Sequence, residues 1–183
     1  MNQKMAKETI EQRRGEGKSD QQIYNELAEH YANKKNLALL ITGTATSEDK
    51  NRFRLYNNLL IGLLTITLLL RLLSSFQLVQ AGEFPGFLII VAAIMPALFI
   101  YGISQHLAPM YKLCGILSVL GIITILATWG TGALTGEGSL NKLVDLVLVV
   151  PIAILSFYLA GKMFPKFNPG KLQSDGKDGY ILG

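Results

Sequence analysis

Long apolar stretches alternate with short polar connections over the C-terminal two thirds of the chain. Four of these stretches approach the ~20 residues that a helix needs to cross a hydrocarbon core about 30 Å thick. They cover residues 55–73, 87–103, 113–129 and 143–163. Because the connections are short and contain small or turn-forming residues, neighbouring spans are predicted to run antiparallel. The pattern predicts an all-α, polytopic membrane protein with four transmembrane helices.

The N-terminal part of the chain follows an amphipathic pattern instead. Residues 19–22, Ser-Asp-Gln-Gln, have the form of a capping box, so a helix is predicted to begin there. Ile23, Leu27 and Tyr31 follow at intervals of four, which places apolar side chains on one helix face. We expect one cytoplasmic amphipathic helix of roughly five or six turns, ending near Thr42.

Ser47 is a second predicted N-cap, followed by two acidic residues where the helix dipole favours negative charge. No breaker separates it from the first apolar stretch, so one long helix is predicted to begin in water and enter the bilayer. These boundaries give a cytoplasmic N-terminal helical region (1–46), a four-helix transmembrane domain (47–163) and a cytoplasmic C-terminal tail (164–183).

Two Asp-Gly pairs lie in the C-terminal tail, at residues 175–176 and 178–179. Asp-Gly is a preferred pair in the tight turns of β-hairpins. The tail is therefore predicted to form a small hairpin, with Leu172 facing Tyr180 or Ile181.

The basic residues indicate the orientation, because positive charge resists translocation. With four spans, one side collects 15 of the 17 Lys and Arg, and the other holds only Arg71 and Lys142. Arg71 is predicted to lie near a span end, where a long basic side chain can snorkel to the headgroups. Both termini are expected in the cytoplasm. The compact loops and the lack of a cleavable signal segment fit a bacterial inner membrane.

Composition narrows the function classes. The chain is 50% hydrophobic and 16% charged, whereas soluble domains carry about 25% charged residues, so whole-chain disorder is excluded. The single cysteine, Cys114, excludes a disulfide scaffold. Residues 1–57 hold 10 basic and 8 acidic residues, a balance that does not fit a nucleic-acid arm. Phosphate loops, nucleophile elbows and zinc-binding helices are missing. We therefore predict no catalytic residue, cofactor, metal or nucleic-acid partner.

Asp145 and Lys142 are the candidate intramembrane polar site. A carboxylate two residues inside the fourth span is costly unless it is paired or hydrated. It either faces a cavity as an ion or proton site, or forms an interfacial salt bridge with Lys142 on the same helix face, which is the simpler reading. Glu26, His30 and His106 could converge on a metal, but a solvated helix face explains them more simply.

Small residues at helical spacing are the candidate packing positions, because they allow helix backbones to approach closely. They pack the four helices of one chain together or join copies of it. These positions are Ala93, Ala97, Gly115, Ser118, Gly121, Ser156 and Ala160.

The expected function follows from these observations. We predict a non-enzymatic integral membrane protein, an accessory, immunity-like or scaffold subunit that binds another membrane protein. The first alternative is a self-assembling channel or membrane-perturbing effector. The second is a membrane enzyme acting on lipid or peptide, which needs polar residues that converge at one bilayer face. The expected partners are the lipid bilayer and either a membrane protein or further copies of the chain.

Overall fold

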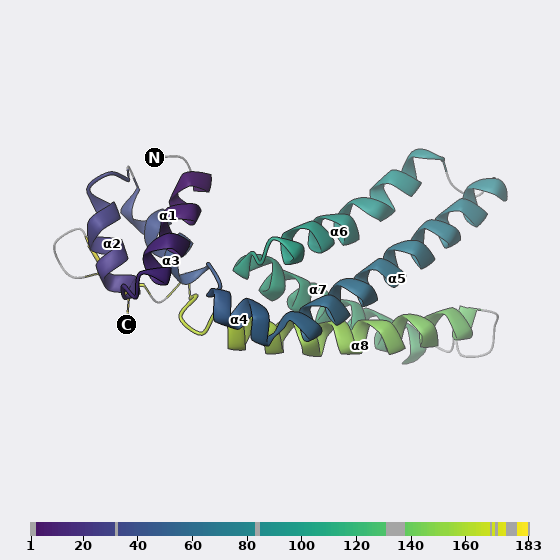
Figure 1. The fold of residues 1–183 in the computed structure, drawn as a ribbon. Coiled ribbons are helices and arrows are strands. Elements are labelled where there is room, and N and C mark those ends of the chain that lie inside the picture. Colours follow the sequence, from purple (N-terminus) through teal and green to yellow (C-terminus); the bar gives the residue numbers. More distant parts are fainter. Residues whose placement is uncertain are drawn as a thin grey trace. The chain divides into compact units, whose positions relative to one another are not determined.

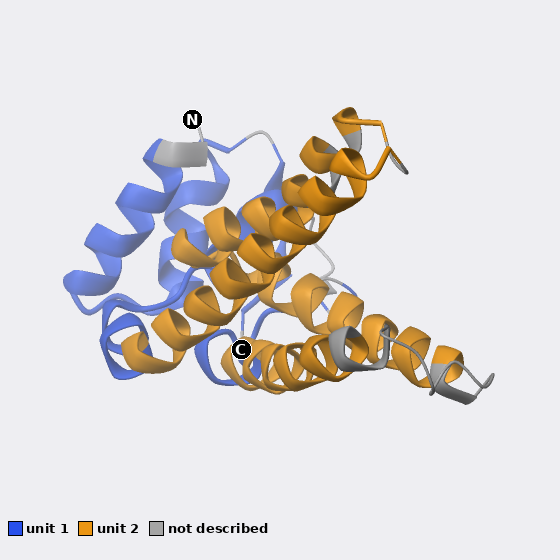
Figure 2. Cartoon of the chain, turned by 90° about the vertical axis from the view of Figure 1, so that its right-hand side faces the viewer, with its two compact units in different colours: residues 1–53, 161–183 blue, residues 54–160 orange. Residues whose placement is uncertain are grey.

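The computed structural model describes residues 3–31, 33–82, 85–130, 138–168, 170, 172–174 and 179–182. The chain forms two compact units, coloured separately in Figure 2. Residues 1–53 and 161–183 make the terminal unit, and residues 54–160 make the span unit. Apart from one short pair of strands, the described elements are helices, so the all-α prediction is confirmed.

The terminal unit contains α1 (Gln3–Gly15), α2 (Asp20–Ala28), α3 (Lys34–Thr42), α4 (Ser47–Arg52) and the strands β1 (Gln173–Ser174) and β2 (Tyr180–Ile181). Apolar side chains from α1, α2, α3 and the end of β2 meet in one core. Its buried members are Ile10, Ile23, Tyr24, Leu27, Leu37, Ala38, Ile41 and Leu182. Residues from the two ends of the chain therefore share one hydrophobic core.

The prediction of one amphipathic helix from Ser19 to Thr42 is wrong, because α2 and α3 are separate helices. The capping box at Ser19 is present as predicted. The interruption is caused by a second cap: the Asn33 side chain accepts a hydrogen bond from the Asn36 backbone N–H at 3.0 Å. Asparagine is a strong N-cap, so it starts a new helix where periodicity alone suggested continuation.

The long helix predicted from Ser47 through the first apolar stretch is also interrupted. Thr46, one residue earlier than predicted, is the N-cap, and its hydroxyl accepts from the Asp49 N–H at 3.1 Å. α4 ends at Arg52, its C-cap Phe53 has a ψ of 9° outside the helical region, and a new helix begins at Arg54. Phe53 is buried, so the break coincides with an apolar side chain held in a core.

The C-terminal hairpin forms, with a different register from the one predicted. β1 and β2 are antiparallel, and Gln173 pairs with Ile181 and Ser174 with Tyr180. Leu172 is consequently one step beyond the Gln173–Ile181 pair and does not face Tyr180 or Ile181. The predicted turn residues 175–178 lie outside the described residues.

The span unit consists of α5 (Arg54–Gln80), α6 (Phe87–Ser104), α7 (Ala108–Gly130) and most of α8 (Gly138–Met163). Three helical segments are long and apolar enough to cross a membrane: Arg54–Gln80, Ala108–Thr128 and Lys142–Met163. A shorter apolar segment, Ala93–Ser104, belongs to α6. These segments make the chain compatible with a multi-pass membrane protein.

The helices of the span unit form two antiparallel pairs. α5 packs along α6, and α7 meets α8 where Gly115 faces Phe157 and Gly121 faces Val149. The pairs lie close together near the turn of residues 105–107, which joins α6 to α7, and diverge toward their other ends (Figures 1 and 2). His106 adopts a φ of 51° in that turn, and Pro109 lies in the first turn of α7, where proline is tolerated.

Candidate functional site: a cavity among the span helices

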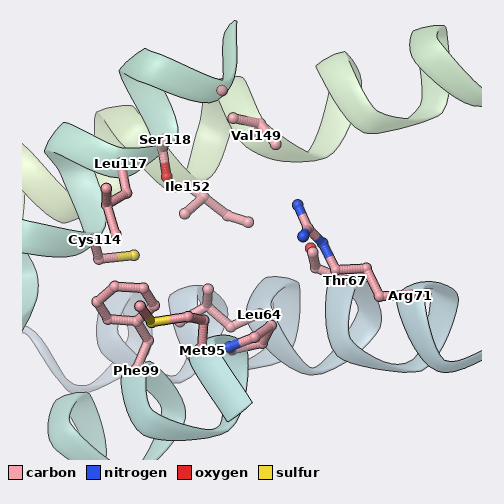
Figure 3. Close-up of a pocket in the computed structure, with 12 residues that line it drawn as sticks. Leu64, Thr67, Arg71, Met95, Phe99, Cys114, Leu117, Ser118, Val149 and Ile152 are labelled. Atoms are coloured by element: carbon pink, nitrogen blue, oxygen red, sulfur yellow. The ribbon is translucent and has the colours of Figure 1, made fainter. Parts of the chain in front are cut away.

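A cavity of about 200 Å³ lies among all four helices of the span unit (Figure 3). One end is apolar and enclosed by four buried side chains. These are Leu64, Phe99, Cys114 and Ile152, all 8% exposed or less. The other end is bordered by Thr67, Arg71 and Val149 (Figure 3). The cavity therefore has an apolar end and an end that carries a charge.

Arg71 is the charged residue among the twelve that line the cavity. Its side chain projects from α5 into the space that Thr67 and Val149 border (Figure 3). The helix does not end at Arg71, because α5 continues nine residues further, to Gln80. At 1.5 Å per residue, the helix extends about 13 Å beyond Arg71.

A buried hydrogen bond ties α5 to α7 below the apolar end of the cavity. The Tyr111 hydroxyl donates to Oδ1 of Asn57 at 2.6 Å, and it also lies 3.2 Å from the Ile103 carbonyl oxygen. Tyr111 is completely buried and Asn57 is 4% exposed. A buried polar group that loses its partner is costly, so a shift of α5 against α7 that broke this hydrogen bond would be unfavourable. The bond therefore fixes the position of α5 relative to α7 where the two helix pairs lie close together.

The candidate packing residues fall into two groups. Gly115 allows close contact between α7 and α8, since a Cβ there would lie 2.9 Å from two ring atoms of Phe157. Ser156 and Ala160 on α8 are also buried. Ser118 and Gly121 line the cavity instead.

The two alanines on α6 differ from the positions on α7 and α8. Ala93 is half-buried, and Ala97 is exposed on the surface of the span unit. A helix packed against this face could approach the α6 backbone closely, because alanine adds only a methyl group.

Asp145 and Lys142 lie on one turn of α8, with Asp145 exposed. The ion pairs found within the described part of the chain do not join them. Among the described residues, no group of three His, Cys, Asp or Glu side chains is placed to hold a metal ion, so Glu26, His30 and His106 are not brought together as one.

Arg14 is the polar centre of the terminal unit. Its guanidinium donates to Asp20 Oδ1 at 2.9 Å, to the Thr44 carbonyl at 2.7 Å and to the Ile41 carbonyl at 2.8 Å. The last two acceptors lie at the C-terminal end of α3, where carbonyls lack helical partners and a positive charge is favoured. One side chain thus joins α1 to the start of α2 and the end of α3.

Three charged groups on α1 and directly after it have shifted pKa values. The hydrogen bond and charge of Arg13 lower the pKa of Glu16, and the same hydrogen bond raises the pKa of Arg13. Burial lowers the pKa of the Lys7 ammonium, and the nearby charge of Lys50 lowers it further. The first pair is exposed, so these charges organise the surface of the unit rather than a reaction centre.

Sequence reasoning did not predict that Arg71 lines a cavity among the span helices. One available signal was the absence of any Gly or Pro between Leu73 and Ala81, which allows the helix to continue past the apolar stretch. The convergence of Arg71 with side chains from three other helices has no local signal. Comparison of the chain with protein-family models, with curated proteins and with solved structures finds no match.

Proposed function

We propose that the protein is a non-enzymatic, multi-pass membrane protein that serves as an accessory or scaffold subunit for another membrane protein. One observation carries the proposal: the segments before and after the spans fold together into a unit with its own core. Such a unit presents a preformed surface beside the membrane, and its described residues include no metal-ligand group.

The shared core also supports four spans. A chain that leaves the terminal unit at residue 53 and returns at residue 161 crosses the membrane an even number of times. Three helical segments are long enough to cross, so α6 is the natural fourth. Its 18 residues make a helix about 27 Å long, close to the thickness of the hydrocarbon core.

The charge distribution supports a cytoplasmic terminal unit. Residues 1–53 contain nine Lys and Arg and residues 161–183 contain four, so 13 of the chain's 17 belong to this unit. Lys and Arg are enriched on the cytoplasmic side of membrane proteins. We therefore place both termini in the cytoplasm, and we propose a bacterial inner membrane as the location.

The exposed face of α6 is the proposed contact with the partner. Gly115, Ser156 and Ala160 are used within the chain, whereas Ala97 is free on the surface of the span unit. A partner helix could therefore pack against the alanine face at residues 93 and 97.

The test is purification of the tagged, intact protein in mild detergent, followed by native mass measurement of the complex. We expect one heavier species that contains a second membrane protein. Ala97→Leu should weaken it, whereas Ala127→Leu on the exposed surface of α7 should not. Recovery of the chain only as a monomer or homo-oligomer, with ion leakage from liposomes of the pure protein, would instead support the channel alternative.

A further inference from the structure

Arg71 is an exposed residue of α5 whose guanidinium projects into a largely apolar cavity. Among the described residues, Arg71 forms no ion pair and no side-chain hydrogen bond. An arginine at the centre of a membrane helix costs at least ~2.5 kcal/mol, and this cost falls toward the span ends, where the side chain snorkels to the headgroups; arginines that face a cavity usually pair with an anion or mark a ligand pathway. The side chain here turns into the cavity (Figure 3). An anion in the cavity would offset that cost.

We propose that this cavity binds a single-chain fatty carboxylate, with its carboxylate on Arg71 and its hydrocarbon chain directed toward Phe99 and Cys114. The proposal rests on the membrane location of the span unit and is independent of the accessory role. The planar guanidinium matches a carboxylate through two parallel N–H···O hydrogen bonds.

The shape of the cavity selects the rest of the ligand. Leu64 and Arg71, near its two ends, are seven residues apart on α5, which corresponds to about 10 Å. The wall between them is mostly apolar, and the side chains at the far end are buried. The order of the lining, from a charged end to an apolar end, matches an amphiphile with one charged group.

The volume favours a narrow occupant. A helix is 10–12 Å wide with its side chains, and pockets for drug-sized ligands measure roughly 300–1,000 Å³. A cavity of about 200 Å³ is too small for a partner helix, and it has room for one hydrocarbon chain of medium length. A two-chain phospholipid could insert only part of one chain, and its phosphate would have to leave the headgroup layer to reach Arg71.

Asp145 is the protein group that competes with this assignment. It lies one helical turn before Val149, so it is on the same face of α8 that borders the cavity. If the two helix pairs closed, Asp145 could approach Arg71. The carboxylate would then belong to the protein rather than to a ligand, and the experiment must separate the two cases.

The experiment uses the full chain in nanodiscs of zwitterionic lipid and a photoreactive decanoate with a diazirine at the far end of its chain. After illumination, mass spectrometry maps the labelled residues. We expect labels on the peptides around Phe99 and Cys114, competed by unlabelled decanoate but not by decanol. Arg71→Gln should reduce this labelling roughly tenfold or more, because it removes the charge-assisted hydrogen bonds. Lys162→Gln removes an exposed charge at the end of α8 and should leave the labelling unchanged.

A second pair of variants tests the apolar wall. Val149→Phe partly fills the cavity and should reduce labelling, whereas Val147→Phe, at a site 63% exposed on the same helix, should not. Equal labelling of wild type and Arg71→Gln, or equal competition by decanol, would overturn the proposal, because either result means apolar partitioning alone. Competition by added phosphatidylglycerol would assign the site to a phospholipid instead.

The competing ion pair has a distinct signature. If Asp145 is the partner of Arg71, Arg71→Gln and Asp145→Asn each destabilise the protein, and the double variant Arg71→Asp/Asp145→Arg restores stability. That outcome would overturn the proposal. Unchanged stability in Asp145→Asn, together with retained labelling, would support the ligand.

Discussion

The packing of Leu182 into the terminal unit predicts a large effect from a small change near the end of the chain. Leu182 is 6% exposed and belongs to the core formed by α1, α2 and α3. Its neighbour Ile181 is 50% exposed. Leu182→Ala should therefore destabilise helices at least 140 residues away in sequence, and Ile181→Ala should affect them little.

The magnitude follows from the carbon atoms removed. Leu182→Ala deletes three buried carbon atoms at ~0.8 kcal/mol each, and the remaining cavity adds to this loss, for a usual range of about 2–5 kcal/mol. Leu182 is the last described residue, where the backbone can relax into the space, so we expect roughly 2–3 kcal/mol. This corresponds to about 30-fold to 140-fold faster exchange of amides that exchange by opening of the unit.

The assay is hydrogen exchange of the intact, detergent-solubilised protein, followed peptide by peptide. Amides of α2 and α3 should exchange faster in Leu182→Ala, and the backbone of α5 should keep the wild-type rate. Gln21→Ala should act in the same direction, because the Gln21 side chain donates to the Tyr180 carbonyl at 3.2 Å and accepts from the Leu182 N–H at 2.7 Å. Unchanged exchange of α2 in Leu182→Ala would refute the shared core and remove the argument for an even number of spans.

Three further predictions concern single contacts. Gly43→Ala should destabilise the terminal unit by about 1–3 kcal/mol in the same exchange assay, because the added Cβ would lie 2.7 Å from the Leu39 carbonyl oxygen. Gly15→Ala is the control and should be neutral or stabilising, since no atom lies within 4 Å of its added Cβ. Tyr111→Phe should cost about 1–3 kcal/mol in thermal unfolding, because its asparagine partner stays buried, and Tyr101→Phe, at a site 64% exposed, should not. A carbon-detected NMR titration should place the pKa of Glu16 below 4.5, because Arg13 stabilises the charged carboxylate. The interaction then stabilises the folded protein above pH 4.5, and this stabilisation is lost as the pH falls through the lowered pKa. A titration midpoint at or above 4.5 would contradict the contact.

The long apolar helices were predictable because length and hydropathy are local properties. The apolar stretch 113–129, for example, corresponds to the greater part of α7. The extra turns of α5 beyond Leu73 mix four polar residues with Phe76, Leu78 and Val79, so the apolar stretch is interrupted there although the sequence still permits a helix. The break after α2 depends on one asparagine cap, whose small free energy decides between a long helix and two short ones.

The candidate site was less accessible to sequence reasoning. Small residues on α7 and α8 were identified as packing positions, but their pattern does not reveal which of them face a neighbouring helix and which line a cavity. Arg71 became a candidate only when α5, α6, α7 and α8 were seen to surround it. The contact of Leu182 with the N-terminal helices is similarly non-local, because it joins residues about 160 positions apart.

The side of the membrane on which each end of α6 lies tests the central claim most directly. In a Cys114→Ser background, single cysteines at Ala81 and Gln105, both exposed, flank α6. A membrane-impermeant maleimide added to intact cells should label Ala81→Cys, and it should label Gln105→Cys only after permeabilisation. That result means that α6 crosses the bilayer, as four spans and a shared terminal unit require. Labelling of both positions from the same side would contradict the account, because three crossings would put the two chain ends on opposite sides of the membrane.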